Sequence, residues 1–125
     1  MNIARHTDYW RKGSGGDWEA AEILLEKGKI QQGLFFLHLA MEKLIKAHVC
    51  RITRQLPPKS HNLIRLLELT GLDPGLSEKR LLLELNDFCM EGRYPDELAP
   101  PPSHKEALAI LYRIQEVRIW LHNQS

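Results

Sequence analysis

The segment His38–Arg54, which reads HLAMEKLIKAHVCRITR, decides the fold of this chain. At about 100° per residue, its apolar residues and those of the turns before it fall in one arc of a helical wheel. The arc contains Ile30, Leu34, Leu37, Met41, Leu44, Ile45 and Ile52. Roughly opposite stand four cations, Lys43, Lys46, Arg51 and Arg54. The pattern predicts one long helix with an apolar edge facing a core and a basic edge facing solvent or a ligand.

Helices are also predicted on both sides of the long helix. Before it, residues 17–27 form a helix capped by Asp17. The run Gly13–Gly16 argues against a continuous helix further upstream, because each interior glycine costs about 1 kcal/mol. Pro57 and Pro58 end the long helix near Arg54. After it, further helices are expected to follow the caps Ser60, Ser77 and Ser103, the last within a Ser-x-x-Glu capping box.

The arrangement of these segments sets the fold class. No stretch alternates between apolar and polar residues for long enough to predict a strand. The chain has 125 residues, of which 43% are hydrophobic and 26% are charged, enough for one domain with a core and too few for two. We therefore predict that residues 1–125 form a single all-α domain, an up-and-down bundle of four to five helices with one long central helix.

Composition narrows the class of protein further. A net charge of +1 argues against nucleic-acid binding by bulk electrostatics, although it leaves a local basic patch open. No apolar run approaches the ~18 residues of a membrane span, and the N-terminal residues lack the apolar centre of a signal peptide. Cys50 and Cys89 are far apart and are expected to be buried thiols. These features predict a soluble cytoplasmic protein. Neither a metal nor a cofactor is expected, because the ligand motifs of both are missing from the sequence.

Three short motifs occur in a fixed order along the chain. They are A-x-E-K-x-x-K-A at Ala40–Ala47, Ser-His-x-Leu at Ser60–Leu63 and Arg-Tyr-Pro at Arg93–Pro95. Together they resemble the HEPN domain, and Trp10 and Asp17 match the first helix of that family. The resemblance implies a helical bundle that forms homodimers or larger homo-oligomers and binds a nucleotide or RNA. It also implies a small nucleotidyltransferase as partner, in some members within a toxin–antitoxin pair.

The segment Arg93–Asp96 is the first candidate for a ligand site. Arg93 can bind a phosphate bidentately, Tyr94 can stack on a base, and Asp96 follows the proline that fixes the loop. The alternative is structural, with Tyr94 packed on the bundle and Arg93 paired with a carboxylate such as Glu42. In the binding hypothesis, the loop meets polar residues of the long helix, namely Glu42, Lys43, Lys46 and Arg54.

Catalysis is a second hypothesis. Ribonucleases of the HEPN family resemble one another in an Arg-x4–6-His motif, and metal-free RNA cleavage needs a proton acceptor near a cation. In this chain three residues separate Arg118 from His122, and six separate Arg54 from His61 across two prolines. His61, at a predicted helix N-terminus, is expected to favour its neutral form. The alternatives to a binding module are thus a metal-independent endoribonuclease toxin that uses His61 or His122 with an arginine, and a structural assembly subunit.

Overall fold

The computed structural model describes residues 2–124 of the chain. It contains five α-helices and two short 3-10 turns, η1 and η2. They are α1 (Ile3–Glu26), α2 (Ile30–Thr53), α3 (Leu63–Thr70), α4 (Leu76–Leu85), η1 (Asn86–Phe88), η2 (Pro95–Glu97) and α5 (His104–His122). The described residues form no strand. The predicted all-α bundle with one long central helix is therefore confirmed.

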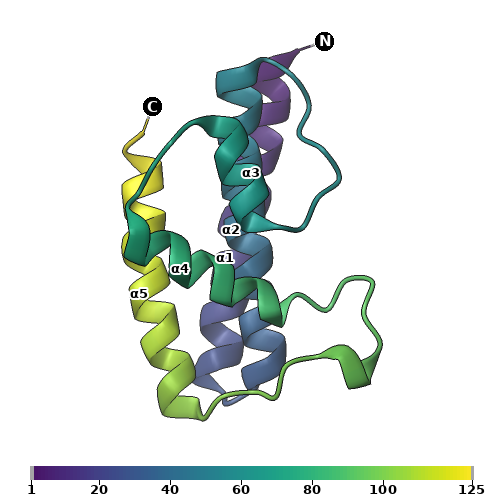
Figure 1. Cartoon of the computed structure of the whole chain (residues 1–125), viewed down its shortest axis with the longest axis vertical. Coiled ribbons are helices and arrows are strands. Elements are labelled where there is room, and N and C mark those ends of the chain that lie inside the picture. The colour runs from purple at the N-terminus through teal and green to yellow at the C-terminus, as the bar shows by residue number, and fades with distance from the viewer. Residues whose placement is uncertain (1, 125) are drawn as a thin grey trace.

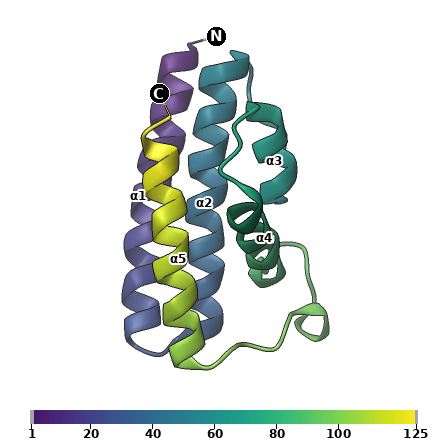
Figure 2. The ribbon, with the colours of Figure 1, turned by 60° about the vertical axis from the view of Figure 1, so that its left-hand side comes forward.

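The three long helices lie side by side, and α1 runs in the direction opposite to α2 and α5 (Figures 1 and 2). The short helix α3 packs on another side of α2, and α4 lies between α3 and α5 in the chain of contacts (Figure 2). Most of the predicted apolar edge of α2 is buried, but Ile52 is exposed and Ile30 is only partly buried. Cys50 and Cys89 are free and buried, as predicted.

The first helix is much longer than predicted. It begins after Asn2, whose side chain accepts a hydrogen bond from the Arg5 amide, and it runs through the glycine-rich segment. At Gly13 and Ser14 this segment packs against α2: a Cβ at Gly13 would lie 3.1 Å from Lys43 Cδ, and the buried Ser14 hydroxyl donates to the Ala40 carbonyl at 2.6 Å. Tertiary packing thus outweighs the poor helix propensity of this segment. Asp17 is consequently a residue of the helix interior and not its cap.

Smaller differences occur at the other helix starts. Asn62, and not Ser60, caps α3, because its side chain accepts from the amides of Ile64 and Arg65. Helix α4 starts directly after Gly75, so Ser77 lies inside it and Leu76 stays exposed. The capping box of α5 is formed as predicted, with Ser103 and Glu106 each bonded to the other's backbone amide. Helix boundaries are the part of the prediction most sensitive to such local hydrogen bonds.

Candidate functional site

A buried ion pair lies at the centre of the candidate site. Glu42 and Lys46 stand one turn apart on α2, and each residue is no more than 5% exposed. The Lys46 ammonium donates to Glu42 Oε2 at 3.0 Å. Charges are rarely buried without a partner, because the loss of water is costly for each ion. The two charges therefore compensate each other, and the ammonium has further donors that Glu42 does not use.

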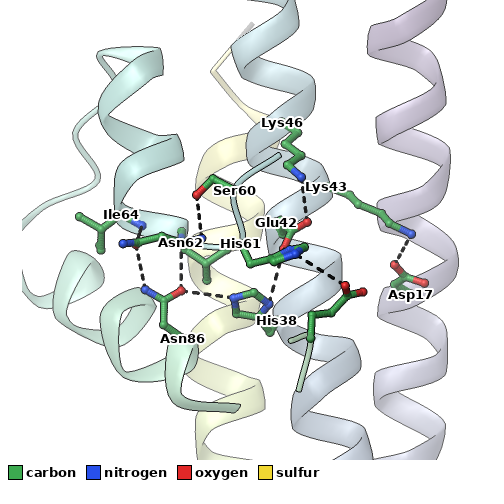
Figure 3. A network of polar contacts seen from close by, with 12 residues as sticks. Asp17, His38, Glu42, Lys43, Lys46, Ser60, His61, Asn62, Ile64 and Asn86 are labelled. Carbon is green, nitrogen blue, oxygen red and sulfur yellow. Dashed lines mark hydrogen bonds and ion pairs between the residues drawn. The ribbon is translucent and has the colours of Figure 1, made fainter. Parts of the chain in front are cut away.

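His61 joins this ion pair from the loop between α2 and α3 (Figure 3). Its Nδ1 lies 2.9 Å from Glu42 Oε1, and its Nε2 lies 3.6 Å from a carboxylate oxygen of Glu91. A carboxylate paired with an ammonium only accepts hydrogen bonds, so Nδ1 of His61 carries the proton. Glu42 thereby fixes the tautomer and the orientation of this half-exposed imidazole.

His38 and Asn86 extend the network behind His61 (Figure 3). Asn86 Oδ1 accepts from the Leu63 amide at 3.0 Å, and its Nδ2 donates to the Asn62 side chain. Because that oxygen is an acceptor, the His38 Nε2 at 3.3 Å must be the donor. Burial lowers the pKa of His38, and the charge of Glu42 opposes the shift only in part. The neutral His38 thus joins α2 to η1 and to the start of α3.

A pocket of about 310 Å³ lies beside Lys46, between α1 and the loop that follows α2. Its apolar wall consists of Tyr9, Trp10, Leu56, Pro57 and Pro58, and its polar residues are His6, Lys46 and Lys59. The Lys46 ammonium lies 5.2 Å from the centre of the Trp10 ring, within range of a cation–π interaction. Tyr9 meets Trp10 edge to face and is 66% exposed. The pocket therefore combines aromatic surfaces with two ammonium groups.

Sequence reasoning did not find this pocket. His6, Tyr9 and Trp10 recur at the spacing of one helix face, which was the available signal. That signal is meaningful only if the helix extends upstream through the glycine-rich segment, whereas the predicted helix begins at Asp17.

The predicted loop residues lie elsewhere. Both terminal nitrogens of Arg93 donate to backbone carbonyls of η1, at 3.1 Å to Asp87 and 3.5 Å to Asn86. Tyr94 is 73% exposed, and Asp96 is exposed within η2. None of the three lines the pocket beside Lys46. The structure thus unites Glu42, Lys46 and His61, while Arg93 holds its own loop to the backbone of Asp87 and Asn86.

The predicted basic edge of α2 is divided in space. Lys43 pairs with Asp17 of α1 at 2.7 Å, and Lys46 is buried beside Glu42 (Figure 3). Arg51 contacts His48 and the Gln124 carbonyl, and Arg54 ends the helix in a left-handed conformation. The four cations therefore have different surroundings and form no continuous stripe.

Comparison with known proteins identifies the family. Residues 7–124 match the HEPN domain, which is nearly the whole chain. The chain belongs to the HEPN domain family. The fold of this HEPN domain is also that of TT1696 from Thermus thermophilus, with 21% identity, complete coverage of both chains and a TM-score of 0.76. ST0689, an archaeal HEPN homologue, gives 17% identity over 94% of this chain and 96% of its own, with a TM-score of 0.70. No curated protein matches.

The other catalytic candidates of this HEPN domain lie on α5. The Arg118 guanidinium stacks 4.5 Å above the Trp18 ring, and burial lowers its pKa. His122 is the last residue of α5, and its pKa is lowered by burial first and then by Arg118 and Arg11. Arg118 and His122 are therefore neighbours, but they lie on a different element from His61.

Two further properties concern the described part of this HEPN domain. Between residues 2 and 124, no helix has an apolar stretch long enough to cross a membrane. Within the same residues, no three His, Cys, Asp or Glu side chains are grouped so as to hold a metal ion.

Proposed function

We propose that this HEPN domain binds a nucleotide unit, free or within single-stranded RNA, in the pocket beside Lys46. The observation that carries the proposal is the aromatic pair of the exposed Tyr9 and the partly buried Trp10, next to the buried Lys46 ammonium. Bases that are not paired stack on aromatic side chains, and their polar edges accept hydrogen bonds from fixed donors. The exposed Lys59, at the same pocket, supplies a positive charge for a phosphate.

The buried network explains how the pocket keeps its shape. Glu42 holds Lys46 in place, and His61 and Asn62 fix the end of the loop that carries Pro57, Pro58 and Lys59. A site whose donors are held by packing and by second hydrogen bonds loses less freedom when the ligand binds. The polar network is therefore the support of the binding site, and the aromatic pair is its contact surface.

The test is calorimetric titration with AMP and with a short single-stranded RNA. Tyr9→Ala should weaken binding by about 1–3 kcal/mol, the contribution of one stacked base. Tyr112→Ala is the matched control, because it removes a comparably exposed tyrosine from α5. Equal affinities for both variants and the unaltered chain would contradict the proposal.

One observation favours an enzymatic role as a second candidate. In the His61–Glu42 pair, Glu42 holds the Nδ1 proton, so Nε2, which lies 3.6 Å from the Glu91 carboxylate, is the ring atom left to act as a base. In metal-free RNA cleavage, Nε2 would take the proton of the 2′-hydroxyl, the 2′-oxygen would attack the phosphorus, and the 5′-oxygen would leave with a proton from water. Cleavage of single-stranded RNA in EDTA should then disappear in His61→Gln and persist in His122→Gln. The opposite pattern would move the activity to Arg118 and His122.

The resemblance also predicts a partner. A small nucleotidyltransferase acting with this HEPN domain, in the manner of a toxin–antitoxin pair, stays a prediction. Co-expression of the chain with a nucleotidyltransferase encoded by a neighbouring gene, followed by size-exclusion chromatography, tests it directly. Elution of the two chains at their separate volumes would count against the pairing.

A further inference from the structure

A second pocket, which the proposed function does not use, lies on another side of α1. It has a volume of about 310 Å³ and lies between the first three turns of α1 and the C-terminal end of α2. Its polar residues are Thr7, Asp8, Arg11, Arg51 and Arg54. The nucleotide pocket is lined from α1 by His6, Tyr9 and Trp10. At about 100° per residue, the α1 residues that line one pocket face a different direction from those that line the other. The two pockets therefore lie on either side of the contact between α1 and α2.

Positive charge dominates this second pocket. Three guanidinium groups line it, against the single carboxylate of Asp8. That carboxylate already pairs with the Lys12 ammonium at 2.9 Å. Guanidinium groups are suited to phosphate, because their planar donors match two phosphate oxygens at once. The net field of the pocket therefore favours an anion with several oxygen acceptors.

Thr7 supplies an independent observation. The residue is only 8% exposed, and among the described residues its Oγ1 has no hydrogen-bond partner although it is inaccessible to solvent. Arg51 Nε is in the same condition. Buried polar atoms are nearly always satisfied, and an anion in this pocket would supply the acceptor that both groups lack, once a side-chain rotation turns them into the pocket.

The pKa values of two histidines are lowered in part by arginines of this pocket. The pKa of His48 is lowered to about 4, by burial first and then by Arg51 and Arg11. The pKa of His122 is lowered by burial, then by Arg118 and Arg11. Arginines of the pocket thus disfavour added positive charge around it, which is the counterpart of favouring an anion.

We propose that this pocket binds the phosphate group of a small phosphorylated molecule through Arg11, Arg51, Arg54 and the Thr7 hydroxyl. The volume of this open pocket lies at the lower end of the range of small-molecule sites. A nucleic-acid backbone is disfavoured by the carboxylate of Asp8 and by a chain net charge of only +1. The proposal is independent of the nucleotide pocket and survives if that pocket proves empty of function.

Pyrophosphate is the probe for the test, titrated into the whole chain by calorimetry at constant ionic strength. Binding should saturate at one site per chain, and Arg11→Gln and Arg54→Gln should each weaken it by about tenfold or more, the loss of a charge-assisted contact. Arg80→Gln is the matched control, since Arg80 is an exposed arginine of α4 outside the pocket. Unsaturable binding, or equal weakening by the control, would overturn the proposal.

Thr7→Val separates ligand binding from folding. The substitution removes an unsatisfied hydroxyl and keeps the shape of the side chain, so the melting temperature without ligand should rise while pyrophosphate binds more weakly. Thr7→Ser should retain the affinity. Unchanged affinity in Thr7→Val would remove the hydroxyl from the site. Two further arms complete the test: Tyr9→Ala should bind pyrophosphate normally, and an oligouridine without terminal phosphate should fail to displace it. Displacement by that RNA would contradict a small-molecule site.

Discussion

At the scale of single residues, the candidate site is held in shape by the buried ion pair between Glu42 and Lys46. Glu42→Gln would leave the Lys46 ammonium buried without its counter-charge, and such changes cost about 3–5 kcal/mol. Glu42→Gln should therefore lower the free energy of unfolding in urea by about that amount. The double variant Glu42→Gln/Lys46→Met removes both charges and should recover most of the loss. Equal destabilisation by the single and double variants would show that the pair is not the source of the effect.

His48 gives this HEPN domain a pH dependence of stability. Its pKa is about 4 in the folded chain against about 6.5 when unfolded, so between these values the unfolded state binds more protons. Stability is fully present above pH 6.5 and is lost as the pH falls towards 4, by about 3 kcal/mol at 1.36 kcal/mol per pKa unit. Urea unfolding between pH 4 and pH 7 should show this slope, and His48→Gln should flatten it. A variant with the same slope would assign it to other groups.

At the scale of elements, the sequence predicts what is decided locally. Three predicted features depend on residues within a few positions of one another. They are the apolar edge of α2, the end of α2 before two prolines, and the capping box of α5. The start of α1 was not predicted, because the continuation of this helix depends on the packing of Gly13 and Ser14 against α2. The same long-range contacts place Tyr9 and Trp10 beside Lys46. Of the polar network, Glu42, Lys46 and His61 were predicted as site residues. Asn86 and Glu91 were not, since they come from segments that carry no recognisable motif.

The glycine-rich part of α1 makes a prediction at this scale. A Cβ atom at Gly15 or Gly16 would meet no atom within 4 Å, so alanine there should stabilise the chain by about 1 kcal/mol per site through helix propensity. At Gly13 a Cβ would lie 3.1 Å from Lys43 Cδ, and the shift of that side chain would disturb its ion pair with Asp17. Gly13→Ala should therefore gain less than the other two. Thermal unfolding of the three variants checks the order, and equal gains would refute the packing argument.

At the scale of the whole molecule, the assembly state stays a prediction of the family resemblance. Phe35 and Phe36 of α2 are half-buried, and Phe36 packs on the core. Exposed apolar side chains do remain on α1 and α5, among them Ile23 and Ile119. We expect a homodimer, with a mass by light scattering of twice the 14.5 kDa of one chain. A mass of 14.5 kDa at high concentration would contradict the expectation.

The proposed function of this HEPN domain requires that the pocket between α1 and the loop after α2 receives a base. The chain has three tryptophans, and only Trp10 lines that pocket, while Trp18 is in the core and Trp120 belongs to α5. The most direct measurement follows their indole N–H signals by NMR during titration with AMP. If AMP binds in this pocket, the Trp10 signal should shift to saturation while that of Trp120 stays unchanged. A Trp10 signal that remains fixed at high AMP concentration would contradict it.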